Sequence, residues 1–393
     1  MSRRPLRVFM MDLLATVPYY TAYLSRALLA EDVDLTVGSV SYYLDRKCFS
    51  SRGIKVSPGC LDLISKCDLP RRLRRPLKLC EALLNQSALA LRFLLSPPDV
   101  LHVQFLPMLT WILPFDLWFV FLCRARGIKI VLTVHDLLPH DTGHAHKATC
   151  LRQYLSVDWI ICHSEHIRKR LSAEFLLSPS KISVIPHGPF FYDLVQAGAE
   201  TAPKSVRGPE GAVCVLWLGI IHPYKGVDLL LEAWQKVEAL GGEHRLVVAG
   251  TGSVEILQQI RKQVVALKLR NVVLELHFIS TLELVQLYRQ ADIVVYPYRA
   301  ITTSGGLATG LALGKTIVAS DLPVFRELLT NRQNALLVDV RSPDELANAL
   351  LELAGNRELR ESLARNVEAM SFGEQSWISI ARSTNEVYRN VLE

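Results

Sequence analysis

The chain has 393 residues, half of them hydrophobic and 21% charged, so it is not intrinsically disordered and is too long for one ordinary domain. Residues 1–190 hold 24 Lys/Arg against 15 Asp/Glu, whereas residues 191–393 hold 20 against 23. A basic half attracts phosphates, nucleic acid or an anionic membrane. Nucleic acid is disfavoured because the sequence has no zinc-ligand spacing, aromatic RNA-binding signature or helix-turn-helix pattern.

The cysteine pattern and the apolar segments bear on the compartment. The eight cysteines form no CxxC pair and most lie in apolar runs, which indicates buried thiols in a reducing, cytoplasmic compartment. The apolar stretch near the start is too short for a signal peptide. Residues 105–123 are apolar, but Pro107, Pro114 and Asp116 interrupt them, which favours a core helix over a membrane span.

The first half alternates short β-branched runs with longer helical patterns, as in a parallel sheet wound with helices. The predicted strands are residues 7–12, 33–39, 100–105, 128–135, 159–164 and 182–186. The predicted helices are residues 19–30, 77–95 and 164–175. These elements predict a doubly wound domain over residues 1–190.

A linker is predicted at residues 191–212, which are rich in Gly, Ala and Pro and lack periodic apolar residues. The alternation then restarts as a second doubly wound domain, residues 213–373. Its predicted strands are residues 213–219, 246–250, 272–276, 293–296, 316–320 and 336–339. Residues 374–393 predict a last helix with one buried face. Ligands of such sheets bind at the carboxyl ends of the strands, here predicted to face a common cleft.

The segment 294–321 carries the strongest pattern for binding an anion. A strand ends before Arg299, and Ser304-Gly305-Gly306 then opens an apolar helix. Unpaired amides and the positive end of a helix dipole suit a diphosphate. Taken alone, the two glycines are equally consistent with a tight strand-to-helix turn.

Two other loops of the second half carry residues typical of phosphate or nucleotide sites. Lys225 follows a strand that ends at Gly219 and precedes a helix, where it can serve as a point charge for phosphate or be a solvated turn residue. Gly250-Thr251-Gly252 lacks the third glycine of the dinucleotide fingerprint, so NAD is not indicated.

His135 and Asp136 end a predicted strand of the first half. A histidine there can donate to a sugar hydroxyl or to developing charge, or it can simply cap the strand. The His and Asp residues that continue through residues 140–146 also raise a metal site. No metal is predicted, because HExxH spacing is missing and Pro139 breaks any helix that would align the ligands.

The ordered segments VLTVHDLLPHD, VIPHG, WLGIIHPYKGVDLLLEAW, VVAGTG, ELVQLYRQADIVVYPY and ALGKTIVASDLPVFREL together resemble glycosyltransferase family 4 and its relatives. The resemblance covers nearly the whole chain and is strongest over residues 213–330. It implies the α/β GT-B fold, with two Rossmann-like domains and a last helix that crosses back onto the first domain. It also implies transfer of a sugar from a UDP- or GDP-linked donor to a saccharide or lipid-linked acceptor, in polysaccharide or glycoconjugate synthesis.

The resemblance implies roles for individual residues. Lys225 matches the family's phosphate-binding lysine, and His135 matches the histidine near the reacting sugar. Ser304, Gly305 and Gly306 fall in the loop whose amides contact the diphosphate. The family usually needs no metal, and the donor is held mainly by the C-terminal domain.

The sequence also departs from the family pattern. Many members carry two glutamates where this chain has Ile301 and Thr309, and the second usually holds the donor ribose. The arginine usually found upstream of the lysine is missing, since Ile220 stands there, and Arg299 is the substitute candidate for the second phosphate cation. Contacts to the nucleotide base are predicted near His277 and Phe278.

Two stereochemical outcomes stay open, of which retention is favoured. For retention, His135 polarises the donor sugar while Lys225 and Arg299 stabilise the leaving diphosphate. For inversion, Asp136 or Asp141 takes the acceptor proton. Loss of the glutamates also permits a catalytically silent scaffold that binds nucleotide or a partner protein, and a sugar-nucleotide epimerase would share the architecture.

A basic run in residues 69–95 precedes an apolar helical pattern. Its members are Arg71, Arg72, Arg74, Arg75 and Lys78. At roughly 1 kcal/mol per basic residue near anionic lipid, this run suits a membrane surface. A solvated charge run that leads into a core helix explains it equally well. If the run binds a membrane surface, it predicts a lipid-linked acceptor and a peripheral position on the cytoplasmic face of a membrane.

Overall fold

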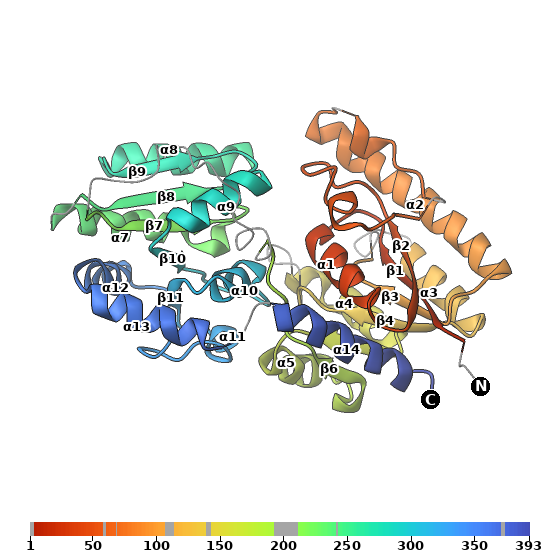
Figure 1. Ribbon diagram of the computed structural model, residues 1–393. Coiled ribbons are helices and arrows are strands. Elements are labelled where there is room, and N and C mark those ends of the chain that lie inside the picture. The colour runs from red at the N-terminus through yellow and green to blue at the C-terminus, as the bar shows by residue number, and fades with distance from the viewer. Residues whose placement is uncertain are drawn as a thin grey trace. The chain divides into compact units, whose positions relative to one another are not determined.

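The computed structural model describes residues 4–57, 60–67, 69–106, 114–138, 143–191, 211–240, 243–370 and 374–393. The chain forms two compact units (Figure 1). Unit 1 holds Met1–Pro186 and Trp377–Glu393, and unit 2 holds His187–Ser376. Most of the predicted linker, residues 191–212, lies outside the described residues.

Unit 1 contains a six-stranded, all-parallel sheet in the order β2-β1-β3-β4-β5-β6. Its strands are β1 (Leu6–Asp12), β2 (Val33–Ser39), β3 (Val100–Val103), β4 (Lys129–Thr133), β5 (Trp159–Cys162) and β6 (Ile182–Val184). All six match the predicted strands. They are mostly short apolar runs because a parallel sheet covered by helices is buried on both faces.

The helices of unit 1 are α1 (Pro18–Leu28), α2 (Arg71–Leu95), α3 (Phe115–Ala125), α4 (Gly143–Ser156) and α5 (Glu165–Phe175), with α14 (Glu374–Asn390) returning to it from Trp377 onward. Helix α2 begins six residues before the predicted start at Leu77, so the basic run forms its first turns, as the good helix propensity of Arg allows. Helix α3 covers the described end of the stretch 105–123 that was predicted as a core helix, and residues 107–113 lie outside the described residues. Phe119, Val120 and Cys123 of α3 are buried, whereas its Trp118 and Phe121 are exposed. Among the described residues, no helix is both long and apolar enough to cross a membrane.

The last helix packs on unit 1, as the GT-B resemblance predicts. Trp377 stacks on Tyr23 with ring centroids 5.4 Å apart and meets the ring of Tyr20 edge-on at 5.6 Å. Farther along the helix, Tyr388 is fully buried and its hydroxyl lies 2.6 Å from His102 Nδ1. The apolar face predicted from the sequence is therefore buried by residues from the first part of the chain.

Unit 2 contains a second six-stranded, all-parallel sheet in the order β12-β11-β10-β7-β8-β9. Its strands are β7 (Cys214–Leu218), β8 (Arg245–Ala249), β9 (Val272–Glu275), β10 (Ile293–Tyr296), β11 (Thr316–Ser320) and β12 (Leu336–Val338), again as predicted. Its helices are α7 (Val227–Ala239), α8 (Val254–Ala266), α9 (Thr281–Gln290), α10 (Gly305–Ala312), α11 (Pro323–Arg326), α12 (Pro343–Gly355) and α13 (Arg357–Glu368).

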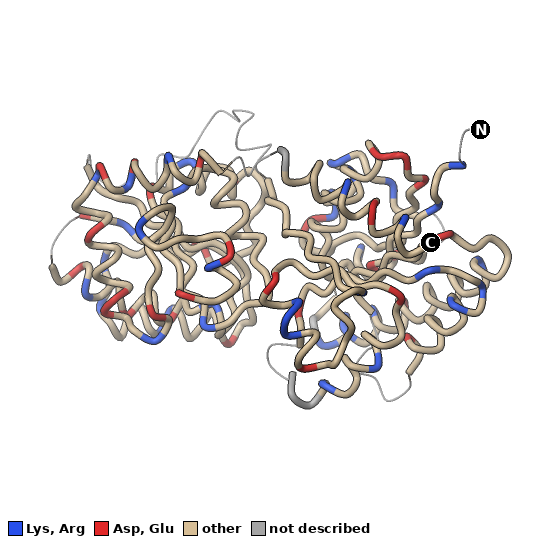
Figure 2. The backbone as a smooth tube through the Cα atoms, turned by 90° about the horizontal axis from the view of Figure 1, so that it is seen from below, with Lys and Arg blue, Asp and Glu red and all other residues tan. Residues whose placement is uncertain are grey.

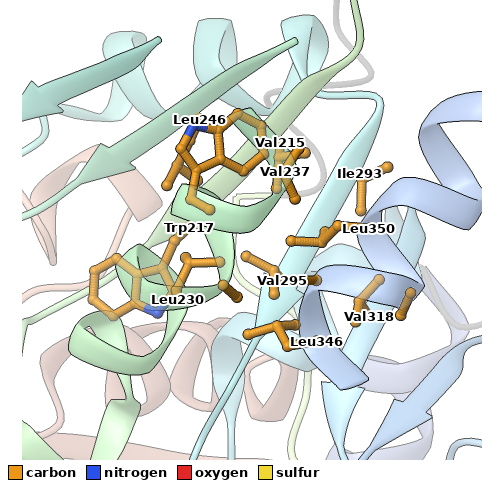
Figure 3. Close-up of a cluster of buried hydrophobic side chains, with 14 of the residues drawn as sticks. Val215, Trp217, Leu230, Val237, Leu246, Ile293, Val295, Val318, Leu346 and Leu350 are labelled. Carbon is orange, nitrogen blue, oxygen red and sulfur yellow. The ribbon is translucent and has the colours of Figure 1, made fainter. Parts of the chain in front are cut away.

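The core of unit 2 lies between its sheet and helices α7 and α12 (Figure 3). Trp217 of β7 and Trp234 of α7 are almost fully buried there, beside Leu346 and Leu350 of α12. Burying one such side chain contributes roughly 1.5–3 kcal/mol. A rigid core of this kind fixes the strand ends from which the loops of the next section begin.

Lys and Arg are interspersed with Asp and Glu along both units (Figure 2). Beyond the basic run at the start of α2, the Lys and Arg residues of unit 1 are interspersed with acidic ones. Several of the basic side chains are paired, for example Arg4 with Asp99 and Arg124 with Asp158.

Candidate functional site

The sheet of unit 2 has its topological switch point between β7 and β10, which are neighbours although β8 and β9 lie between them in sequence. In open α/β sheets, ligands bind outside the carboxyl ends of the strands at this point. The loop after β7 carries Gly219 and Lys225, and the loop after β10 carries Arg299 and leads to Ser304. The topology therefore brings together the residues predicted for a diphosphate.

Lys225 ends a short 3-10 turn that begins at Pro223. Its Nζ lies 5.7 Å from the ring centroid of Tyr298 and 3.3 Å from where a Cβ on Gly219 would be. Gly226, at φ +67°, follows, and a Cβ there would lie 1.9 Å from the carbonyl oxygen of Pro297. Only glycine allows this close approach, so the ammonium group is held over the strand ends by backbone contacts between the two loops.

Arg299 forms hydrogen bonds to the turn that carries Lys225. Its guanidinium donates to both carboxylate oxygens of Asp228 over 2.8 and 2.7 Å and to the carbonyl of Pro223 over 2.7 Å. Its backbone amide donates to the carbonyl of Tyr224 over 2.7 Å. Arg299 is thus bonded to the turn that carries Lys225, and its charge is paired with Asp228. Its predicted role as the second phosphate cation stays a prediction.

Helix α10 begins with the predicted Ser-Gly-Gly sequence. Ser304 is the N-cap, and its hydroxyl accepts a hydrogen bond from the amide of Leu307 over 3.1 Å. The buried Tyr296 donates its hydroxyl to the carbonyl of Gly306 over 2.7 Å. The first-turn amides of a helix have no intrahelical acceptor and carry partial positive charge, so this end of α10 suits an anion.

His187 lies beside Gly305 but was not predicted from the sequence as a site residue. A Cβ on Gly305 would lie 2.5 Å from Phe190 Cε2 and 2.8 Å from His187 Cε1. The imidazole of His187 and the ring of Phe190 also contact each other edge-on at 5.0 Å. His187 belongs to the VIPHG segment quoted for the resemblance, and that motif was the only sequence signal for its place beside α10.

Thr309 ties the same segment to α10. Its hydroxyl donates to the carbonyl of Gly305 over 2.7 Å and accepts from the backbone amide of Phe190 over 2.9 Å. The side chain is buried. The predicted contact of Thr309 with a ribose stays a prediction, and in this conformation the hydroxyl holds two backbone segments together.

His277 and Phe278, predicted near the base, follow β9 at the edge of the sheet. His277 Nε2 lies 3.1 Å from Glu283 Oε1, and Glu283 also forms a capping box with Ser280 at the start of α9. His277 is exposed and Phe278 is half-buried. The two residues are thus on an ordered loop, two strands away from β7.

Unit 1 has its own switch point between β1 and β3. A pocket of about 360 Å³ opens at the carboxyl ends of its strands. Gln104 after β3 and His135 after β4 line it, together with Asp136, Gln153 of α4 and Tyr154 of α4. The predicted His135 and Asp136 therefore share a cavity.

Both ring nitrogens of His135 have hydrogen-bonding neighbours. Nε2 lies 2.9 Å from Gln104 Oε1, and Nδ1 lies 3.4 Å from His163 Nε2. The ring of Tyr20 meets the imidazole edge-on at 4.7 Å. His163 Nδ1 in turn lies 2.9 Å from the carbonyl oxygen of Ile185. The sequence pattern identified His135 but not Gln104 and His163, the two residues that contact its ring nitrogens.

The hydrogen bonds continue on the other side of Gln104. Gln104 Nε2 lies 3.1 Å from His102 Nε2, which is also 2.7 Å from Thr133 Oγ1. His102 and Gln104 are buried. Burial lowers the pKa of His102 to about 3 and the pKa of His163 to about 4, so both are neutral at pH 7.

Asp136 is exposed, and Asp141, the other candidate base, lies outside the described residues together with His140. Among the residues that are described, no three His, Cys, Asp or Glu side chains come together as a metal site. All eight cysteines are free thiols.

Two family models match the chain in succession. Glycosyltransferase Family 4 matches residues 17–188, and Glycosyl transferases group 1 matches residues 199–370. The chain belongs to the family 4-like glycosyltransferases with the GT-B fold. Both switch points described above therefore lie in segments that this family shares.

Relatives among glycosyltransferases align with parts of the chain. An uncharacterized glycosyltransferase of Methanocaldococcus jannaschii is 25% identical over 264 residues, which is 65% of this chain and 66% of the relative. A phosphatidyl-myo-inositol mannosyltransferase of Mycobacterium leprae is 30% identical over 197 residues, 49% of this chain and 50% of the relative. The chain thus spans between half and two thirds of these relatives.

A solved structure shares the fold over nearly the whole chain. Anabaena HepE, in complex with UDP and glucose, superposes with a TM-score of 0.72 at 16% identity, covering 98% of this chain and 100% of that one. The expected GT-B fold is confirmed.

Proposed function

We propose that this protein transfers a sugar from a nucleoside-diphosphate sugar, UDP- or GDP-linked, to a saccharide or lipid-linked acceptor. One observation carries the proposal. The switch point of unit 2 brings Lys225 and the Ser304-Gly305-Gly306 helix start to neighbouring strand ends, which suits the two phosphates of such a donor. The complex of HepE with UDP and glucose supports this choice of ligand.

The charge distribution suits departure of a diphosphate. In the reaction the bond from the sugar's anomeric carbon to the diphosphate oxygen breaks, and a bond to the acceptor oxygen forms. The acceptor's proton leaves to the diphosphate or to solvent. Lys225 and the α10 amides stabilise the negative charge that develops on the leaving group, and Arg299 orders the turn that holds Lys225.

His135 is the proposed partner of the reacting sugar in unit 1, with retention of configuration. Its imidazole lines the pocket of unit 1. If the reaction inverts instead, Asp136 of the same pocket is the proposed base, since its carboxylate is exposed. The anomeric configuration of the product, read by NMR from the coupling constant of its anomeric proton, distinguishes these outcomes.

Calorimetric titration of UDP, GDP and ADP tests the donor site. We expect one diphosphate to bind selectively and Lys225→Ala to weaken it at least about tenfold, because a charge-assisted phosphate contact is lost. Lys236→Ala is the control, since Lys236 lies at the other end of α7 and pairs with Asp344. If none of the three binds at millimolar concentration, the donor site is wrong. Binding without any turnover indicates a silent scaffold.

A lipid-linked acceptor is the proposed acceptor class because α2 has an exposed apolar stripe. Leu73, Leu77, Leu84, Leu91 and Leu95 are 40% to 89% exposed. At 3.6 residues per turn they fall within about 40° of one another around the helix. The name of the Mycobacterium leprae relative, a phosphatidyl-myo-inositol mannosyltransferase, also points to a lipid.

The basic residues of α2 contribute unequally to this surface. Arg72 and Arg75 are exposed, whereas Arg74 packs over the ring of Tyr43 at 4.3 Å. Lys78 turns inward, with its Nζ 3.4 Å from the carbonyl oxygen of Leu14. Arg72 and Arg75 are therefore the exposed cations among the described side chains of the run. Because they lie about 120° and 180° around the helix from the middle of the leucine stripe, they are proposed to attract anionic lipid at longer range instead of contacting it beside the leucines.

Flotation with phosphatidylcholine vesicles, with and without phosphatidylserine, tests this surface. We expect binding that needs phosphatidylserine, lost in Leu84→Ser/Leu91→Ser and weakened in Arg72→Gln/Arg75→Gln. Leu240→Ser is a matched control, because Leu240 is an equally exposed leucine in unit 2. Equal flotation of all variants would exclude α2 as the membrane surface.

A further inference from the structure

The carbonyl oxygen of Ile185 determines which ring nitrogens donate and which accept in the hydrogen bonds around His135. The carbonyl oxygen of Ile185 only accepts, so His163 Nδ1, 2.9 Å away, donates to it. Burial lowers the pKa of His163 to about 4, so at neutral pH its Nε2 has no proton and accepts. His135 Nδ1, 3.4 Å from that nitrogen, is therefore the donor.

With Nδ1 protonated, the charge of His135 depends on Nε2 alone. Gln104 Oε1 lies 2.9 Å from this Nε2. An amide oxygen accepts, so this orientation of Gln104 matches a protonated, positively charged His135. A half-turn of the amide would place its NH2 group toward an unprotonated Nε2 and match the neutral ring.

His102, on the other side of Gln104, accommodates both amide orientations. It is neutral at pH 7, so only one of its nitrogens carries a proton. When the NH2 group of Gln104 points to it, His102 Nε2 accepts and Nδ1 donates to Tyr388 Oη, 2.6 Å away. When the amide oxygen points to it, Nε2 donates and Nδ1 accepts from Tyr388. The chain closes in both cases, and Thr133 Oγ1, 2.7 Å from the same His102 Nε2, can accept from it when it is protonated and donate to it when it is not.

We propose that Gln104 is a positioning residue that keeps His135 hydrogen-bonded in both of its protonation states, because rotation of its amide accompanies gain or loss of the Nε2 proton. The residue can then respond to charge at the reacting sugar without leaving its place in the pocket. This consequence for the reaction rests on the proposed function. The hydrogen-bond pattern itself involves unit 1 alone.

Five other titratable groups belong to the elements packed around His135. They are Asp12 at the end of β1, Tyr20 of α1, Asp136 next to His135, and Cys150 and Tyr154 of α4. Burial raises the pKa of Tyr20, Cys150 and Tyr154, so they stay neutral at pH 7. Asp136 is exposed to solvent, and its negative charge still acts on the cluster, since it partly opposes the lowering of the His163 pKa by burial and adds to the raised pKa of Tyr154. Asp12 accepts hydrogen bonds from the amides of Thr16 and Val17 over 2.9 and 3.1 Å.

The histidine tautomers of the wild-type protein give the first test. Long-range ¹H–¹⁵N NMR of ¹⁵N-histidine-labelled protein, assigned with His135→Gln and His163→Gln, reports which ring nitrogen carries the proton. We expect neutral His163 to be protonated on Nδ1, and His135 to keep its Nδ1 proton throughout its titration. A neutral His135 protonated on Nε2 would overturn the proposal.

Substitution of Gln104 gives the second test. In Gln104→Glu the group that faces Nε2 only accepts and is charged, so the titration of His135 should move up by about one to two pH units. Gln104→Met has a similar size and no such bond, and its titration should not rise. Gln153→Glu is the control, because it adds a carboxylate to the same pocket outside the hydrogen-bonded chain. An unchanged titration in Gln104→Glu contradicts the proposal, and if this variant does not fold, the wild-type tautomers still decide.

Rate measurements separate this proposal from the proposed function. If wild-type protein transfers sugar, the pH profile of kcat should move with the His135 titration in Gln104→Glu, which a merely structural role would not produce. If the titration moves but no transfer is found with any donor, the proposed function fails and the role of Gln104 stands. If transfer persists with an unshifted profile, Gln104 does not act on the reaction through His135.

Discussion

The guanidinium of Arg299 and the carboxylate of Asp228 form a two-pronged ion pair, with N–O distances of 2.7 and 2.8 Å. The residues come from different sides of the switch point, since Arg299 follows β10 and Asp228 lies in the first turn of α7. Both flank the turn that carries Lys225. The pair therefore joins the two loops from which the proposed diphosphate site is built.

This relationship predicts that Asp228→Asn weakens diphosphate binding nearly as much as Arg299→Ala, by about tenfold or less, because either change loosens the Lys225 turn. Calorimetry with the selected diphosphate measures both. A large loss in Arg299→Ala with wild-type affinity in Asp228→Asn would instead show that Arg299 contacts phosphate itself. The ion pair is 41% and 45% exposed, so its effect on stability should be under about 1 kcal/mol.

Gly305 and Gly306 should respond differently to alanine. A Cβ on Gly305 collides with Phe190 and His187, whereas the nearest atom to a Cβ on Gly306 is 3.5 Å away. We expect Gly305→Ala to lower the free energy of unfolding by about 1–3 kcal/mol and Gly306→Ala to fold normally. Thermal melts measure this, and equal melting temperatures would contradict the packing of Phe190 on α10.

Thr309→Val should destabilise unit 2 by about 1–2 kcal/mol, because it leaves the half-buried amide of Phe190 without its acceptor. Thr309→Ser keeps the hydroxyl and should lose less. Urea unfolding of both variants provides the comparison. If valine is tolerated as well as serine, the hydroxyl has no structural role and its predicted contact with a ribose becomes the reason for its presence.

Two buried histidines should make unit 1 sensitive to acid. The pKa values of His102 and His163 are about 3 and about 4 when folded, below the value of about 6.5 for an exposed histidine. Between these limits the unfolded chain binds more protons than the folded one, so stability is full above about pH 6.5 and falls as the pH decreases toward 4. The slope should approach about 1.4 kcal/mol per pH unit for each histidine.

Urea midpoints at pH 7, 6 and 5 measure this dependence. His163→Gln can still donate to the carbonyl of Ile185 and does not titrate, so its midpoint should fall less steeply with acid than that of the wild type. Parallel curves for the two proteins would show that His163 is not buried in its neutral form.

The alternation of apolar runs and helical patterns by itself determined the fold. The twelve strands of the described residues lie where short apolar runs predicted them, because such runs between helices have few alternatives to a buried parallel sheet. The boundary of α2 was misplaced, since its first turns are arginine-rich and carry no apolar periodicity. Local sequence patterns also identified Lys225, His135 and the helix start at Ser304 as candidate site residues, because each follows the end of a predicted strand.

Only the tertiary structure decided what these residues contact. The pairing of Arg299 with Asp228, the bonds of Thr309 to Phe190 and the inward turn of Lys78 join positions 71, 119 and 64 residues apart. Local sequence patterns extend over a few turns of chain, whereas such contacts depend on strand order. The partners of His135 follow the same rule, because Gln104 and His163 reach it only once β3, β4 and β5 lie side by side.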